Sequence, residues 1–363
     1  MKLTLYKLFL LALLLPAISF ASNDLDGRHT KEKTIKKEFK VSQTGTLDID
    51  NNYGNVDIST WNENRIVIQV FIKTNGNDLD RVKNKLDDIS VEFHQTGNRV
   101  SAETHYQKED RSWWSGLFNS NNNVNMEINY VIKAPANHDM VIDNDYGAIY
   151  IDKVLGNTDI SCDYGKIDIG ELRGRKNFLN FDYTRNCHFG YITSAEIDAD
   201  YSGFTIEEAE ELIISADYSD SNIEKVSRLK FNCDYGSIRV DKVKHLNADG
   251  DYLSTKIGRV FGSLSINQDY GSINIEKLIN GVESVNIDTD YAGIRLGYDA
   301  EMDFVFEVQT SYGGVKGTDD LEITKRHDRN TSKDISGYYG NQNSRNSINI
   351  STSYGSVSFQ KVR

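Results

Sequence analysis

A tyrosine recurs about every eighteen residues along most of this 363-residue chain, and this spacing constrains the fold more than any other feature. Tyr53 precedes the series, and Tyr291, Tyr312 and Tyr354 continue it at longer intervals. A fixed period of this length is typical of repeat architectures, in which each unit packs only on its neighbours. The regularly spaced members, 17 to 19 residues apart, are Tyr146, Tyr164, Tyr183, Tyr201, Tyr218, Tyr235, Tyr252 and Tyr270.

Apolar residues alternate on both sides of each tyrosine. Leu212 and Ile214 stand six and four positions before one, and Ile238 and Val240 stand three and five positions after another. A period of two predicts β-strands with one buried face. Glycine or a small residue follows most of the tyrosines, as a corner between two strands requires. From this parity we expect the tyrosines to point inward and the residues directly before them to point outward.

Each repeat therefore holds two short strands and two bends, which cannot bury a core alone. We predict an all-β fold, a right-handed parallel β-solenoid (β-helix) of about 11–12 rungs with ~18-residue repeats, since right-handed crossovers are preferred between parallel strands. At ~4.8 Å per rung the rod would be roughly 50 to 60 Å long. An antiparallel sandwich would show recurring two-residue hairpin signals, and a left-handed hexapeptide helix would need a strict six-residue period. The chain shows neither.

The N-terminus predicts export. Lys2 and Lys7, an apolar run over residues 8–15, and small residues near the cleavage position are typical of a secretory signal peptide over residues 1–21. The apolar run is shorter than the ~20 residues that span a bilayer. We expect a protein that is exported to the periplasm, the outer surface or the medium, and that is not integral to a membrane.

The remaining chain divides around one large insertion. An N-terminal segment at 22–38 leads to a first rung at 39–61, and solenoid repeats occupy 138–363. Between them, residues 62–137 combine strand patterns with one helical pattern, which predicts a small α+β cap on the end of the stack. A second insertion, at 317–343, carries the basic cluster 325–329 and is predicted to be a solvated loop.

An aromatic loop lies within the predicted cap. Its sequence RSWWSGLF is followed by Asn and Ser residues, and aromatic side chains in a polar loop are typical of binding surfaces. The same rings could instead plug the cap or cover the side of the solenoid. The candidate partner-binding residues are Trp113, Trp114 and Phe118.

Aspartate stands directly before nine successive tyrosines. Carboxylates one rung apart would repel each other by roughly 0.9 kcal/mol in water, so some interaction should offset this cost. One interpretation is a line of Ca²⁺ sites, and the other is hydrogen bonding of each carboxylate to backbone N–H groups at its corner. Calcium-binding repeats of the GGxGxD kind are absent from the sequence, which favours the second. The weak Ca²⁺ candidates are Asp163, Asp182, Asp200, Asp217, Asp234, Asp251 and Asp269.

The three cysteines are predicted to be core thiols. Cys162 and Cys233 share one inward position but lie four rungs, or roughly 19 Å, apart, which excludes a disulfide between them. Cys187 lies across the corner from Cys162. We expect small buried side chains with at least one free thiol.

The sequence carries no signal for catalysis, a cofactor or nucleic acid. The net charge of −13 lacks the basic face of a phosphate-backbone binder. The seven histidines form no zinc-binding pair, and no nucleophile elbow, phosphate loop or dinucleotide fingerprint occurs. We predict no catalytic residues, no cofactor and no enzyme. A polysaccharide lyase or hydrolase on a β-helix stays as an alternative, because its acidic residues could hide in the aspartate rows.

Several segments resemble the bacterial exported "putative adhesin" family, a β-strand-repeat domain of unknown function that is head-GIN-like and of Bacteroidetes type. These are FKVSQTGTLDIDNNYGNVDISTW at 39–61, the IKAP run at 132–135, the DYG-x-I-x-I repeats and the closing SINISTSYGSVSFQKV. The resemblance covers about residues 35–363. It implies an envelope protein with a role in adhesion, surface structure or envelope-stress signalling, and it brings no catalytic residues.

The first functional hypothesis is a non-enzymatic envelope or cell-surface binding module that contacts a glycan or an envelope protein. The alternative is a structural or stress-sensing solenoid that self-associates end to end.

Overall fold

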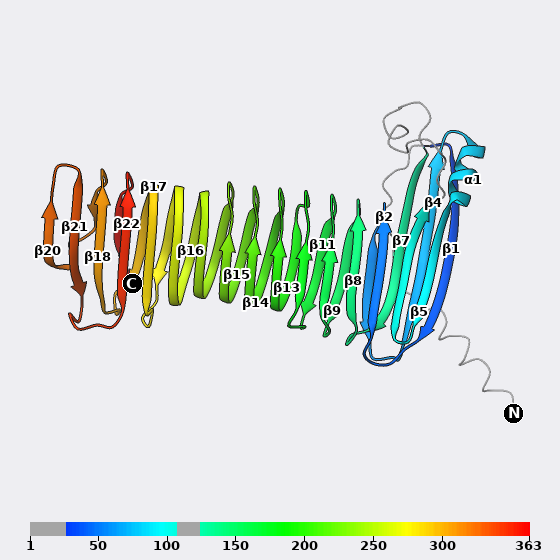
Figure 1. The fold of residues 1–363 in the computed structure, drawn as a ribbon, viewed down its shortest axis with the longest axis horizontal. Coiled ribbons are helices and arrows are strands. Elements are labelled where there is room, and N and C mark those ends of the chain that lie inside the picture. The colour runs from blue at the N-terminus through cyan, green and yellow to red at the C-terminus, as the bar shows by residue number, and fades with distance from the viewer. Residues whose placement is uncertain (1–26, 107–123) are drawn as a thin grey trace.

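The computed structural model describes residues 27–106 and 124–363. Apart from one helix, these residues form an all-β structure of 23 strands in one unclosed sheet, drawn out as a long stack (Figure 1). No helix within these ranges is long and apolar enough to cross a membrane. The predicted signal peptide and the aromatic loop with Trp113, Trp114 and Phe118 lie outside the described residues.

Successive repeats pair in parallel. Strand β14 (Gly203–Ser215) aligns with β15 (Asp220–Asn232) so that Phe204 faces Ser221, an offset of 17 residues. Each repeat adds one strand segment before its tyrosine, to what we call the first ladder, and one after it, to the second ladder. In mid-chain a single long element contributes to both, as in β13 (Cys187–Asp198), β14, β15, β16 (Ser237–Leu278) and β17 (Ser284–Asp299).

Near the N-terminal end the two ladders consist of separate short strands. The first ladder includes β2 (Thr46–Asn52), β8 (Asp139–Asp145), β10 (Thr158–Ser161) and β12 (Asn177–Asn180). The second includes β3 (Val56–Trp61), β9 (Ala148–Val154) and β11 (Lys166–Leu172).

The alternation in the sequence sets the core. The inward aliphatic residues of both ladders belong to one hydrophobic cluster that extends through the stack, including Leu212 and Leu229 of the first ladder and Ile206 and Ile223 of the second. Each fully buried aliphatic side chain contributes about 1.5–3 kcal/mol. The three cysteines are buried and free, as predicted.

Antiparallel strands cover the N-terminal end of the stack. Strand β7 (Asn125–Pro135) continues the second ladder in parallel with β3, and β4 (Arg65–Gly76) and β1 (His29–Lys40) follow it antiparallel. On the first ladder, β6 (Arg99–Tyr106) pairs with β2, and β5 (Ile89–Thr96) forms an antiparallel hairpin with β6. Helix α1 (Leu79–Asp88) begins after Asp78, whose carboxylate accepts hydrogen bonds from two backbone N–H groups.

At the C-terminal end the strands do not follow chain order. Strand β22 (Ser347–Ser353) lies between β17 and β18 (Phe304–Ser311), parallel to both. Likewise β23 (Val357–Val362) lies between β17 and the short β19 (Val315–Lys316). The last repeat of the chain therefore fills an interior position of the stack.

The prediction of a loop at 317–343 is wrong. This segment contains β20 (Glu322–Asp328) and most of β21 (Ser332–Tyr339), and β21 pairs antiparallel with both β18 and β20. The side chains of β20 are largely exposed, so no apolar alternation marks the strand in the sequence. The unpaired edge of β18 supplies the backbone hydrogen bonds that hold these strands.

Candidate functional site

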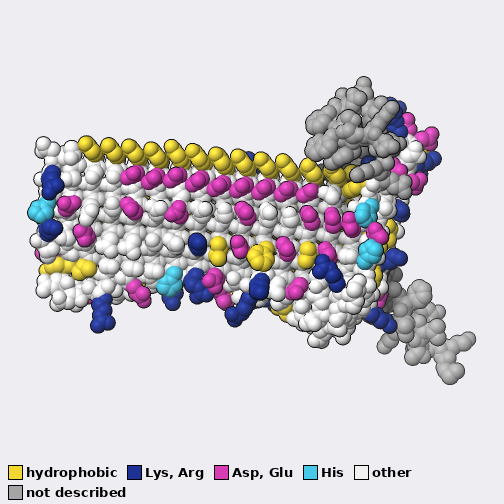
Figure 2. Space-filling view, viewed as in Figure 1, with side chains coloured by type: hydrophobic (Ala, Val, Ile, Leu, Met, Phe, Trp, Pro, Cys, Tyr) yellow, Lys and Arg dark blue, Asp and Glu magenta, His cyan; other side chains and the backbone are white. Residues whose placement is uncertain are grey.

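The tyrosines point outward, which corrects the expectation that they fill the core. From Tyr146 to the end of the chain, their exposed fraction runs from 39% at Tyr270 to 64% at Tyr312. Figure 2 shows a row of hydrophobic side chains along one edge of the stack, with a row of acidic side chains beside it. We call the twelve repeat tyrosines the tyrosine row. It is a continuous aromatic surface. The one sequence signal for its exposure is that the repeat position holds Tyr, which has a polar hydroxyl group, and not a purely apolar residue.

Backbone geometry explains why the alternation of inward and outward side chains did not predict the direction of the tyrosines. All twelve tyrosines have a positive φ, between 53° and 66°. This left-handed conformation is uncommon for residues other than glycine, asparagine and aspartate. It interrupts the alternation of a strand, so the tyrosine stays on the outer face together with the aspartate before it. The next residue turns inward instead, as the burial of Ser202 and Ser219 shows.

The rings of the row stack on one another. Neighbouring centroids are 4.7–5.3 Å apart and the ring planes differ by 1–7°. The stack follows the strand order, so Tyr354 lies between Tyr291 and Tyr312. Because the ring faces contact each other, the row presents mainly ring edges and hydroxyl groups to solvent.

The corners leave little space beside the row. A Cβ at Gly147 would lie 1.8 Å from the carbonyl oxygen of Gly54, and one at Gly165 would lie 2.0 Å from that of Gly147. In two repeats serine takes the place of this glycine and forms a hydrogen bond to the next repeat: the Ser202 backbone N–H donates to Ser219 Oγ at 2.9 Å. Close backbone approach therefore selects the small residues after the tyrosines.

The aspartates before the tyrosines bond to the backbone of the next repeat. The N–H of Asp200 donates to Asp182 Oδ1 at 3.0 Å, and the N–H of Asp217 donates to Asp200 Oδ1 at 3.1 Å. Asp182, Asp234, Asp251 and Asp290 donate in the same way to Asp163, Asp217, Asp234 and Asp269. These bonds offset repulsion along the row. Calcium binding by Asp163, Asp182, Asp200, Asp217, Asp234, Asp251 and Asp269 stays a prediction. Across the described ranges, no group of three or more His, Cys, Asp or Glu side chains is arranged to hold a metal ion.

A second outward position lies two residues earlier in each repeat and is aspartate in some repeats and serine or asparagine in others. Partial burial, followed by the charges of Asp50 and Asp163, raises the pKa of Asp143. Partial burial and the charges of Asp200, Asp182 and Asp217 raise the pKa of Asp198. The carboxylates of Asp143 and Asp198 therefore hold their protons more tightly than usual.

This outer face also contains a shallow depression of about 460 Å³. Its outward lining includes Asp198, Ile213, Lys230, Asn232 and Asn247, and Ile213 is 47% exposed. Amide, hydroxyl and carboxylate groups around an exposed apolar side chain can hydrogen-bond to the hydroxyls of a ligand and contact its apolar groups.

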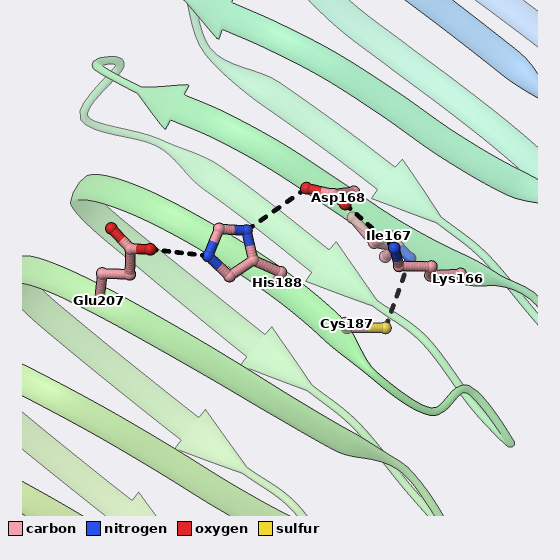
Figure 3. A network of polar contacts seen from close by, with 6 residues as sticks. All are labelled: Lys166, Ile167, Asp168, Cys187, His188 and Glu207. Atoms are coloured by element: carbon pink, nitrogen blue, oxygen red, sulfur yellow. Dashed lines mark hydrogen bonds and ion pairs between the residues drawn. The ribbon is translucent and has the colours of Figure 1, made fainter.

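A polar network on the second ladder has the composition of a catalytic site but not its geometry (Figure 3). His188 Nε2 lies 3.0 Å from Glu207 and Nδ1 lies 3.3 Å from Asp168, which itself pairs with Lys166. The hydrogen bond to Glu207 is the main cause that raises the pKa of His188. Cys187, the neighbouring nucleophile, is buried on the opposite face of the strand, and burial raises the pKa of its thiol. The network is thus an exposed set of ion pairs across three strands.

A groove of about 790 Å³ lies on the outer face of β1, β4 and β7. Its lining mixes Trp61, Val67 and Phe71 with lysines and glutamates. The Arg65 guanidinium lies 4.5 Å from the Trp61 ring and pairs with Glu38, so much of the charge is internally balanced. The balance of charges gives this groove no preference for an anionic or a cationic ligand.

Comparison with known proteins finds matches among solved structures, at low sequence identity. The chain is similar to a "putative cell adhesion protein" from Clostridium sporogenes, at 11% identity over 92% of this chain and 100% of that one, with a TM-score of 0.19. It is similar to a "putative adhesin" from Parabacteroides merdae, at 9% identity over 93% and 98%, with a TM-score of 0.36. A "putative lipid binding protein" from Parabacteroides distasonis matches at 11% identity over 91% and 97%, with a TM-score of 0.28. No family model matches the chain, and no curated protein matches it.

Proposed function

We propose that this chain is an exported, non-enzymatic binding protein of adhesin type, which holds an extended ligand along the tyrosine row and the outer face of the first ladder. The row itself carries the proposal. At twelve corners a bulky ring occupies a backbone conformation that glycine adopts at lower cost. Stacking offsets part of this cost, but the ring edges remain in solvent, and a continuous exposed aromatic surface is typical of a binding site.

We infer that the two ladders are opposite walls of a right-handed parallel β-solenoid. The parallel register, with offsets of 17 residues between β14 and β15 and 21 between β16 and β17, supports this inference. The single core cluster shared by both ladders supports it too. In this arrangement residues 39–61 form the first rung, 62–137 the cap and 138–363 the remaining rungs.

The ligand that suits this surface is an extended, uncharged glycan. The surface repeats once per rung, so a chain of similar units can meet the same groups many times and gain affinity through multivalency. Carboxylate, amide and phenol groups bond well to sugar hydroxyls, whereas the acidic rows disfavour uronate or phosphate polymers. The predicted signal peptide and the resemblance to exported adhesins support a location in the envelope, where such glycans occur.

The test removes rings from four adjacent rungs. We expect Tyr201→Asn/Tyr218→Asn/Tyr235→Asn/Tyr252→Asn to weaken binding to immobilised envelope glycans by at least about tenfold, or about 1.4 kcal/mol. Asparagine tolerates a positive φ, so the corners should still form. The matched control, Thr205→Ala/Asn222→Ala/Arg239→Ala/Lys256→Ala, alters the second ladder of the same rungs. Equal binding by both folded variants would refute a role for the tyrosine row.

A further inference from the structure

We propose that the tyrosine row is a site of oxidative cross-linking, where a haem peroxidase with hydrogen peroxide joins neighbouring rings as dityrosine. This modification is independent of glycan binding, since it depends only on the mutual geometry and accessibility of the rings.

Successive rings of the row lie close together and nearly parallel. Tyr235 and Tyr252 have centroids 4.7 Å apart and planes 5° apart, and Tyr252 and Tyr270 repeat this arrangement at 4.7 Å and 4°. Each of these rings therefore has another phenol ring at close range, so the reactive carbons beside its hydroxyl have a neighbouring ring nearby. Half-exposed side chains can tilt about χ1 and χ2, which lets these carbons approach to bonding distance.

From Tyr146 onward, the phenol groups of the row are accessible to solvent. None of these eleven hydroxyl groups has a hydrogen-bond partner among the described residues, and Tyr312 at the end of the stack is 64% exposed. A peroxidase therefore needs to reach only one ring. The unpaired electron can then pass between stacked neighbours at van der Waals distance.

Competing nucleophilic side chains are protected. Cys162, Cys187 and Cys233 are buried, and burial raises the pKa of Cys162 and of Cys233 to about 12. These thiols are thus shielded from an oxidant that cannot enter the core. The exposed phenols are the accessible alternative.

The reaction balances with one hydrogen peroxide per link. Each of two phenols loses one electron to the oxidised haem and one proton from its hydroxyl, which gives two phenoxyl radicals. The radicals couple through ring carbons beside the oxygens, and one C–C bond forms. The two hydrogens on the coupled carbons leave as protons while two protons return to the oxygens. The peroxide is reduced to two water molecules.

A link between adjacent rungs would join residues 17 to 21 positions apart within most of the row. Such a cross-link restricts the unfolded chain in the same way as a disulfide that closes a loop of that length. The predicted result is a rod with a covalently reinforced edge.

The experiment compares two full-length variants with the same six-residue change. In the alternating variant, every second ring of the stack becomes phenylalanine, so that no two tyrosines of the row adjoin. In the block variant, six consecutive rings are replaced and four adjacent pairs remain. The alternating set is Tyr146, Tyr183, Tyr218, Tyr252, Tyr291 and Tyr312, and the block set is Tyr201, Tyr218, Tyr235, Tyr252, Tyr270 and Tyr291.

Each dilute protein is treated with peroxidase and hydrogen peroxide, then measured by dityrosine fluorescence, intact mass and peptide mapping. We expect monomers that lose two hydrogen atoms per link, with links between stack neighbours in the wild type and the block variant, and a several-fold lower yield in the alternating variant. No dityrosine in the wild type, equal yields from both variants, or links only between molecules would each overturn the proposal.

Discussion

The tyrosine at each corner combines an unfavourable backbone conformation with a favourable side-chain stack. A left-handed φ costs an L-residue roughly 1–2 kcal/mol. Stacked aromatic pairs contribute about 0.5–1.5 kcal/mol each beyond area burial, and an interior tyrosine of the row has two such partners. Each stacking contact is shared by two rings, so stacking offsets part of the backbone cost and makes a non-glycine corner tolerable.

This balance predicts opposite results for two substitutions at Tyr218, which stacks on Tyr201 and Tyr235. Tyr218→Phe keeps both stacks and should leave the free energy of unfolding within about 0.5 kcal/mol of wild type. Tyr218→Val loses both and places a β-branched residue at a φ of 54°, so it should cost about 2–4 kcal/mol. Urea denaturation provides the measurement. Similar stabilities for the two variants would show that the stack contributes little.

Asp143 predicts a pH-dependent gain in stability. Its pKa is raised in the folded protein, first by burial and then by Asp50 and Asp163. The folded state therefore binds the proton more tightly than the unfolded chain does, and the charged form costs stability above the folded pKa. This cost decreases as the pH falls through the folded pKa and is gone below the pKa of the unfolded chain. We expect Asp143→Asn to raise the melting temperature at neutral pH. The free energy of unfolding should increase by no more than about 0.5 kcal/mol.

The advantage of Asp143→Asn should vanish near pH 3, where both folded and unfolded Asp143 are largely protonated. Asn180 and Asn232 occupy the same repeat position, so the amide suits the site. Thermal denaturation at the two pH values checks this. A stabilisation of equal size in acid would mean that charge is not its cause.

Single residues also show where sequence reasoning succeeds and fails. Alternation correctly predicted that Leu212, Ile214, Ile238 and Val240 are buried, because side-chain period follows directly from extended backbone. The same alternation predicted inward tyrosines, because it holds only where every residue has the negative φ of an extended strand. A positive φ at a bulky residue is rare, so local sequence gives little warning of it, although it determines the candidate site.

At the scale of strands, the interior position of β22 could not be predicted from the chain. The repeats around Tyr312 and Tyr354 have compatible patterns, and chain order favours stacking the second outside the first. The structure reverses them because β20 and β21 occupy the free edge of β18. The final strands then fill the space between β17 and β18.

This topology predicts a local effect of a charge in β22. Ile350→Asp places a carboxylate at a position that is 3% exposed, between β17 and β18, and an unpaired buried charge is strongly destabilising. We expect hydrogen exchange to accelerate in β18, β21 and β22 and to stay unchanged in β14 and β15, since repeats contact mainly their neighbours. Ser351→Asp, one residue on and outward-facing, is the control. Uniform loss of protection along the whole rod would contradict this account.

At the scale of the whole molecule, the ends of the stack differ from its sides. Among residues 27–106 and 124–363, strand β1 pairs with β4 and with no other strand, and β1 carries five lysines. Strand β20 at the other end is also an edge and is largely exposed and polar. Charged edge strands are a common protection against edge-to-edge pairing.

The protected ends predict a monomer rather than end-to-end polymers. Light scattering should show one monodisperse species as the concentration rises. Lys33→Val/Lys36→Val/Lys37→Val should promote concentration-dependent association through β1. Lys225→Val/Lys242→Val/Lys244→Val, which removes equal charge from the side of the rod, should not. Polymerisation of the wild type, or of both variants alike, would instead favour a self-associating structural role.

The stacked repeat also has an evolutionary consequence. Each repeat brings its own corner tyrosine, its own aspartate and two strand segments whose partners are the neighbouring repeats. A tandem duplication of one mid-chain repeat would thus insert a ready-made rung without new contacts elsewhere. Selection could adjust the length of the aromatic edge in steps of one ring by gain or loss of DNA segments about eighteen codons long, with little need for compensating point mutations.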